Sequence, residues 1–464
     1  MDVLRSAKLK FSSRAFTRIV EACFLLSLLA GCFHFRLPAV VPSTISFTEL
    51  TKAVAEMRGL QPKQDIKLEM SDANADAPDT TLNESDGPWD IVQVGRAYNR
   101  VGLLPENTDF AKAVADYRRL ERIVHYEAQT ATVVIRPEAS SLGRAFSETD
   151  PRIAAEVPGV FGIVRALQEQ HFHWQERMKS FVLEDQQLAL RAVATGDATL
   201  AALSRANNST IDFSSAAAAQ IVSRLASVVE ISAANLPDLL RWKLLFPYRE
   251  GSQFVSWAQT ARGWPGVNAL FANPPLSTSQ ILHPEKYYLQ RANPLRIHPW
   301  GLARQMKESP IMEQTLGEYL ARLLLSSARS AKEAERIASG WQDDLLRAYK
   351  EGDSVATIWI SSWKTDKEAT EFFRAYFEVL EKAHRIHFQP SANRNGGLQA
   401  ELPGGRSMLL QVKGPTVLLL DGLMSARSAE IAQDVWRDLE TDKEPAAIPF
   451  ESARSFDQLA SRSR

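Results

Sequence analysis

The sequence predicts an α+β fold that is mainly α-helical. Residues 153–245 are rich in alanine and poor in glycine, a composition that favours helices. Thr130–Arg136 is rich in β-branched residues and stops at Pro137, which predicts a small strand element before this helical region. The third observation is a strand–helix–hairpin pattern near the C-terminus.

The C-terminal pattern combines three local signals. Thr365 and Glu368 form a capping-box pattern, which predicts the start of a helix. An apolar segment rich in β-branched residues precedes this helix. Two more apolar segments follow it and flank a Lys-Gly-Pro turn. The expected elements are a strand, a helix and a hairpin: Val355–Trp363, 365–384, and 407–412 with 416–420.

The remaining elements follow from periodicity and composition. Leu50, Val54 and Met57 recur at helical spacing and predict an amphipathic helix from Phe47 to Arg58. Proline, glycine and aromatic residues in 247–301 predict a long ordered loop region. Three further helical ranges are expected at 89–126, 312–325 and 331–349. The last residues, 425–464, are expected to form a loosely packed polar helix and tail.

Composition excludes several functional classes. The chain has 464 residues, and its 54 basic and 55 acidic residues nearly cancel. Because a protein devoted to nucleic acid usually carries a basic excess, we expect no nucleic-acid partner. The two cysteines, Cys23 and Cys32, both lie near the N-terminus. A disulfide scaffold and a cysteine-based zinc site are therefore excluded from the body of the chain.

The N-terminus has the pattern of a bacterial lipoprotein signal. A basic region precedes an apolar run from Ala22 to Phe33, which is too short to span a bilayer as a helix. The run contains Leu29-Ala-Gly-Cys32, which resembles a lipobox and implies a lipid on Cys32. Phe33 after the cysteine implies the outer rather than the inner membrane. An uncleaved signal anchor is the alternative.

A flexible tether and a folded body are expected after the signal. Residues 71–88 contain five acids, no base and two prolines, a composition that favours disorder. The expected division is a signal peptide, an N-terminal segment with the acidic tether, a main domain, an α/β unit and a polar tail: 1–31, 32–88, 89–350, 351–424 and 425–464.

Two segments form the outline of a zinc motif. Phe161–Phe172 is FGIVRALQEQHF and Ala192–Thr199 is AVATGDAT. They resemble a family of secreted bacterial proteins similar to gluzincin-type zinc metallopeptidases, whose forms are HELTHALQDQHF and ALVEGDAT. In the active motif two histidines and a downstream glutamate bind zinc, and the glutamate after the first histidine activates a water.

The residues that would perform this chemistry are replaced in this chain. The resemblance places Phe161 and Arg165 at the two histidine positions, Gly162 at the general base and Thr195 at the downstream ligand. Phenylalanine cannot ligate zinc, glycine cannot act as a base, and arginine brings a permanent cation. The resemblance therefore implies a degenerate member with no catalytic residue, no metal and no cofactor.

The resemblance continues along most of the chain and implies a gluzincin-like fold over about residues 89–422. A second departure lies at Gln342-Asp343-Asp344, where the family has a Gly-Gly-Asp turn. The further similar segments are 246–287, 315–325, 340–349 and 359–373.

A residual pocket is expected from polar residues near these motifs. Asp197 follows the lost glutamate position, and we expect it to pair with Arg165. With no metal present, the residues of the HPEKY segment are expected to hold their loop together by hydrogen bonds. The candidate residues are His171, Asp197, His283, Glu285 and Tyr287.

The leading hypothesis is a non-catalytic, lipid-anchored protein of the bacterial cell envelope. Its old substrate cleft would bind a protein or peptide partner, or would serve as a scaffold, and Cys32 would hold it to the membrane. One alternative is a hydrolase with a relocated site around His171, His283 and Glu285. Another is a purely structural envelope protein.

Overall fold

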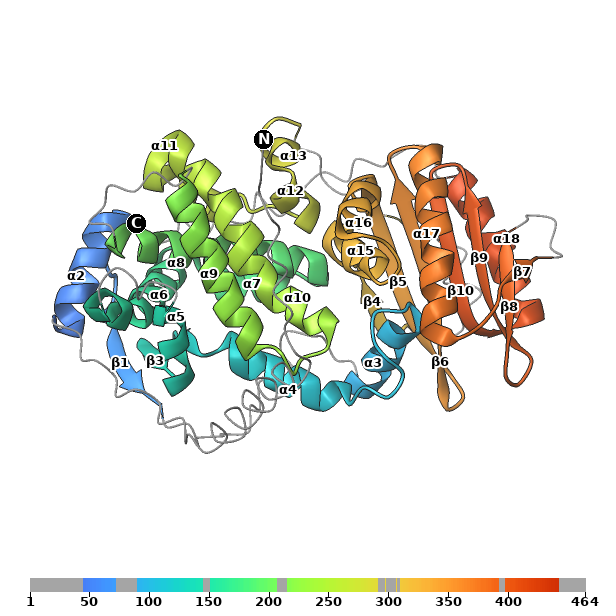
Figure 1. The fold of residues 1–464 in the computed structure, drawn as a ribbon, viewed down its shortest axis with the longest axis horizontal. Helices are drawn as coiled ribbons and strands as arrows, with labels where there is room; N and C mark the ends of the chain where they lie inside the picture. Colours follow the sequence, from blue (N-terminus) through green and yellow to red (C-terminus); the bar gives the residue numbers. More distant parts are fainter. Residues whose placement is uncertain are drawn as a thin grey trace, which may run out of the picture. The chain divides into compact units, whose positions relative to one another are not determined.

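The protein is an α+β structure with two sheets (Figure 1). The computed structural model describes residues 45–71, 90–144, 151–206, 215–290, 297, 306, 309–391 and 397–441. The predicted signal peptide, Cys32 and nearly all of the acidic tether lie outside these ranges. Within them, no helix combines the length and the apolar character needed to cross a membrane.

Helices dominate the first two thirds of the described chain. Several begin at a side-chain cap; Ser46 and Glu49, for example, form a capping box at the predicted helix Phe47–Arg58. In chain order they are α2 (Phe47–Arg58), α3 (Ile91–Arg100), α4 (Phe110–Glu121), η3 (Pro137–Ala139), α5 (Ser140–Arg144), α6 (Pro151–Phe172), α7 (Trp174–Ser180), α8 (Glu184–Ala206), α9 (Ala216–Ser232), α10 (Asp238–Phe246), the π-helical turn η4 (Pro247–Gly251), α11 (Ser252–Ala272), α12 (Thr278–Leu282) and α13 (Pro284–Tyr288).

A small sheet lies beside the motif helix α6. Its strands are β1 (Lys67–Met70), β2 (Val124–Glu127) and β3 (Thr132–Ile135), in the order β1-β3-β2. β3 confirms the strand predicted before the helical region, and all four of its residues are buried. α6 packs against β2 and β3, so the position of the motif helix is set by this sheet.

The second sheet has seven strands in the order β4-β5-β6-β10-β9-β8-β7, and each neighbouring pair is antiparallel. The predicted strand, capped helix and hairpin are all present, with Thr365 as the cap of α17. The elements of this part are β4 (Met312–Gln314), α15 (Gly317–Ser326), α16 (Ala331–Ala338), β5 (Trp341–Glu351), β6 (Ser354–Trp363), α17 (Asp366–His384), β7 (Gln389–Pro390), β8 (Leu398–Leu402), β9 (Arg406–Lys413), β10 (Thr416–Met424) and α18 (Ser425–Thr441).

Alternating residues of the large sheet form two separate cores. Trp359 and Leu419 face α17 and join the main hydrophobic cluster, where Trp363 stacks on Phe372 of α17 at 4.2 Å between centroids. Ile358, Ile360 and Leu418 point to the opposite face, because successive residues of a strand face opposite sides. α18 covers that second face with Ile431, Ala432, Val435 and Trp436. The expectation of a loosely packed C-terminal helix is therefore wrong.

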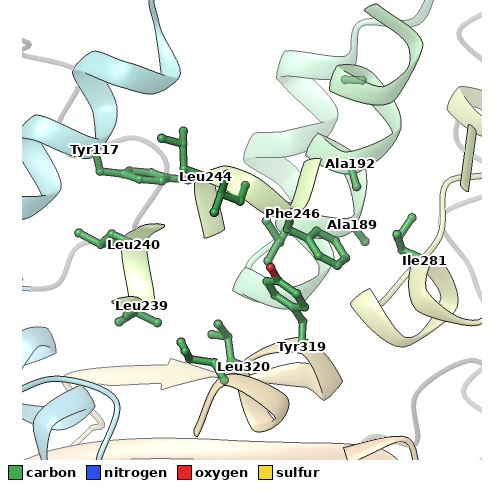
Figure 2. Packing of buried hydrophobic residues seen from close by; sticks show 14 of the residues in the cluster. Tyr117, Ala189, Ala192, Leu239, Leu240, Leu244, Phe246, Ile281, Tyr319 and Leu320 are labelled. Carbon is green, nitrogen blue, oxygen red and sulfur yellow. The ribbon is translucent and has the colours of Figure 1, made fainter. Parts of the chain in front are cut away.

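The main core continues from the helices into the sheet region. Figure 2 shows Phe246 of α10 between Tyr319 of α15 and the α8 residues Ala189 and Ala192. The rings of Phe246 and Tyr319 lie 4.3 Å apart between centroids, and both side chains are fully buried. α8 thus lies in the middle of the core, which explains why its small residues are buried along most of its length.

Several expectations about secondary structure are wrong. The expected helical range 89–126 ends in the strand β2, and the expected helix 312–325 begins with the strand β4. Residues 247–301 are not a long loop, because η4, α11, α12 and α13 occupy the described part of this range. Residues 331–349 form a helix only as far as Ala338, and β5 follows. The tripeptide Gln342-Asp343-Asp344 consequently lies in a strand, not a turn. The expected boundary between 350 and 351 falls within the β5–β6 hairpin.

Candidate functional site

The structure brings together two of the four positions that the resemblance assigns to zinc chemistry. Arg165 projects from α6 and donates from Nη2 to the Thr195 hydroxyl of α8 at 2.7 Å. Nη1 of Arg165 also donates to Gln168 at 3.4 Å, and the guanidinium lies over the Trp174 ring, 4.8 Å from its centroid. The second histidine position and the downstream glutamate position of the resemblance are therefore filled by one arginine–threonine contact.

The other two positions are closed by packing. Phe161 is buried and its ring lies 6.4 Å from that of Tyr248. Gly162 faces β3, where a Cβ atom on this glycine would lie only 2.1 Å from Cγ1 of Val133. Because carbon atoms in contact normally lie about 3.5–4 Å apart, a side chain at position 162 has no room.

Asp197 does not pair with Arg165, which corrects the expectation from the sequence. Its carboxylate instead binds Arg58 of α2, with Nε–Oδ1 and Nη2–Oδ2 distances of 2.9 and 3.0 Å. Gln168 donates to the same carboxylate at 2.9 Å, and Trp264 lies over the Arg58 guanidinium at 4.4 Å. Both charged side chains are completely buried. Sequence reasoning missed Arg58, which looked like an ordinary basic residue at a helix end.

Two glycines of the motif segments allow close contact between helices. A Cβ atom on Gly196 of α8 would lie 2.5 Å from the Gly251 carbonyl oxygen. A Cβ atom on Gly251 would lie 2.4 Å from the Ala192 carbonyl oxygen. Only glycine permits backbones to approach this closely. The motif segment of α8 and the segment at 246–251 are thus adjacent in space, and this contact places Tyr248 of η4 near Arg165.

A cavity of about 740 Å³ lies beside the Arg165–Thr195 contact. Its wall is formed by α3, α4, the β2 region, α6, α7, α8, α10, η4 and β4. Aromatic rings supply much of the lining, from Tyr98, Phe110, Tyr117, Trp174 and Tyr248. The cavity also includes the exposed Ala128, so it reaches the surface beside β2.

Two acidic residues of the cavity wall are held in ion pairs. Glu121 binds Arg191 at 3.1 Å, and Glu184 binds Lys243. Arg165 forms no ion pair with any carboxylate in the described ranges, and burial lowers its pKa from the usual value. Burial also raises the pKa of the Tyr248 phenol to about 12, so this group stays neutral and able to donate a hydrogen bond.

The five residues expected to form a residual pocket do not line this cavity. His171 bonds to the Gln61 carbonyl at 2.7 Å, and Tyr287 donates to the Asn273 carbonyl. His283 contacts Glu318 of α15 at 2.6 Å.

The carboxylate of Glu318 binds the HPEKY segment to α15. Glu318 is buried and accepts from Ser279 at 2.6 Å, while Lys286 lies 3.3 Å from it. Glu285 contributes a longer contact of 3.7 Å to His283. His283 and Lys286 therefore bond the segment to α15, instead of holding a loop together as expected. In the ranges that the structure covers, no group of three or more His, Cys, Asp or Glu residues is arranged to hold a metal ion.

Comparison with known proteins gives one partial match. Residues 305–433 match the model of a domain family described as a domain of unknown function (DUF8575). This range holds all seven strands of the large sheet and part of α18, and leaves out Arg165 and Thr195. No curated protein and no solved structure matches the chain.

Proposed function

We propose that this chain is a non-catalytic binding protein of the bacterial cell envelope, with a gluzincin-like body whose former zinc site has become a ligand cavity. The supporting observation is the contact of Arg165 with Thr195 in the wall of the 740 Å³ cavity. A guanidinium occupies the place where the resemblance would put a dication. A permanent cation there opposes metal binding, while the cavity beside it has the size of a ligand site.

The relocated hydrolase gains no support from the placement of its residues. His171 and His283 each have a separate hydrogen-bond partner, Gln61 and Glu318, and neither lines the cavity. Glu285, the third residue of that hypothesis, lies 3.7 Å from His283 and does not line the cavity either.

Elemental analysis tests the non-catalytic part of the proposal. The full chain, purified without chelator and incubated with equimolar zinc, should retain far less than one zinc per chain. A zinc site needs three or four ligands together, and only Thr195 among the four degenerate positions has a side-chain oxygen atom. One tightly held zinc per chain, lost when His171 or His283 is replaced by alanine, would reject this proposal in favour of the relocated enzyme.

The anchor is a second part of the proposal, and it rests on the sequence. Cys32→Ala should abolish incorporation of labelled fatty acid and block processing of the signal, because the thiol is the site of lipid attachment in the resemblance. Cys23→Ala is the matched control, since it removes the only other cysteine and should label like the wild type. Equal labelling of the Cys32→Ala variant and the wild type would show that the lipobox interpretation is wrong.

A further inference from the structure

Arg165 presents unused hydrogen-bond donors in the cavity wall. A guanidinium has five N–H groups in a planar fork. Two of them donate to Gln168 and Thr195, both of which are neutral acceptors. The other three have no protein acceptor in the described part of the chain. The hydrogen-bond partners of Arg165 therefore include no negatively charged group.

The acidic residues nearest to Arg165 are already bound elsewhere. Glu121 binds Arg191, and Asp197 binds Arg58. Glu169, one turn further along α6, accepts from the backbone N–H of Gln175 at 2.9 Å. None of these three carboxylates bonds to Arg165, so a ligand could supply the negative charge that the contacts of Arg165 lack.

A second unpaired donor lies in the same wall. The indole Nε1 of Trp174 is buried and has no hydrogen-bond partner among the described residues. Arg165 lies over the face of this ring. Since buried polar groups are nearly always paired, two unmatched donor groups side by side mark a place that is short of acceptors.

The rest of the cavity is suited to an apolar group. Phe110, Val114, Leu240 and Leu244 line it together with the aromatic rings already described. Its volume falls within the range of sites that enclose most of a small ligand. A ligand that fits must therefore combine one anionic group with an apolar body.

We infer that this cavity binds an organic carboxylate with an apolar body, with the carboxylate held by Arg165 and the apolar part among the rings. Carboxylate geometry matches the guanidinium fork, which can donate two parallel hydrogen bonds. This inference rests on the proposed function, because it gives the ligand class of the same cavity. A free small acid and the C-terminus of a peptide share this chemistry.

Calorimetric titration of the full chain in detergent tests the inference with two matched pairs of probes. The first pair is 4-phenylbutyrate and 4-phenylbutyramide, and the second is a tripeptide ending in phenylalanine with a free or an amidated C-terminus. Each acid should bind the wild type roughly 10- to 100-fold more tightly than its amide. Binding of only the small acid identifies a free acid as the ligand type, and tighter binding of the peptide acid identifies a C-terminus.

Four variants separate the contributions. Arg165→Gln should abolish the preference for the acid, and Arg165→Lys should keep only part of it because the fork is lost. Arg241→Gln is the matched control, since Arg241 lies on α10 but does not line the cavity. Ala128→Trp places a large ring at the exposed lip and should weaken every probe.

The outcomes distinguish this inference from the proposed function. Equal binding of acid and amide, blocked by Ala128→Trp, would overturn the carboxylate inference and leave the ligand cavity standing. An acid preference that survives Arg165→Gln would also overturn it. Absence of binding by all four probes would reject the ligand class, while the zinc measurement would still decide whether the protein is non-catalytic.

Discussion

Replacing Arg58 with methionine should lower the free energy of unfolding by about 3–5 kcal/mol. The Arg58 and Asp197 side chains are both completely buried, and the substitution leaves the Asp197 carboxylate without its cation. Gln168 would remain as a hydrogen-bond donor to that carboxylate. A neutral amide cannot replace the charge of the guanidinium, so the carboxylate would stay buried without a cation and most of its desolvation cost would remain uncompensated. Urea denaturation followed by circular dichroism measures the change.

Two further variants make this prediction specific. Arg336→Met is the matched control, because Arg336 forms a solvent-exposed ion pair with Glu371 and should contribute only about 0–1 kcal/mol. Adding Asp197→Leu to Arg58→Met removes both charges and should recover part of the loss. If Arg58→Met and Arg336→Met had equal effects, the buried pair would not be what holds α2 to α8.

The second large effect is expected at Gly162, the position that the resemblance assigns to the general base. Gly162→Glu should cost more than about 3 kcal/mol, because it combines overpacking against Val133 with a buried carboxylate. Restoring the whole motif, with Phe161→His, Arg165→His and Thr195→Glu added, should not create a zinc site. The helix and β3 lie too close together for the glutamate.

A double-mutant cycle tests the packing explanation without adding a charge. Gly162→Ala should cost about 1–3 kcal/mol by itself, since its Cβ atom would overlap Cγ1 of Val133. In a Val133→Ala background the same change should cost much less, because the overlapping atom has been removed. Equal costs in the two backgrounds, or wild-type stability of Gly162→Glu, would show that β3 does not close this position.

The motif and its surroundings differed in how far they could be predicted. The resemblance placed Arg165 and Thr195 at positions that would share a metal, and the structure places them in contact. The same reasoning gave Asp197 the wrong partner. Arg58 lies 139 residues away in the sequence, and no local pattern indicates that its side chain points inward.

The sequence by itself determined the elements whose signals are local. The capping residues Ser46 and Thr365 start helices at the expected places, and the β-branched runs before α5 and in β6 form strands. These signals depend on neighbouring residues only, since a cap satisfies the first N–H groups of its own helix and alternation follows from strand geometry.

Only the tertiary structure decided which side chains bond to one another and where the cavity lies. It set Asp344 in a strand, where its carboxylate accepts from the indole groups of Trp341 and Trp359 and from two backbone N–H groups. It also decided which cation lacks an acid, because ion pairing depends on groups that only folding brings within a few ångströms. A cavity is likewise a property of how several elements pack, so the site beside Arg165 has no counterpart in any single stretch of sequence.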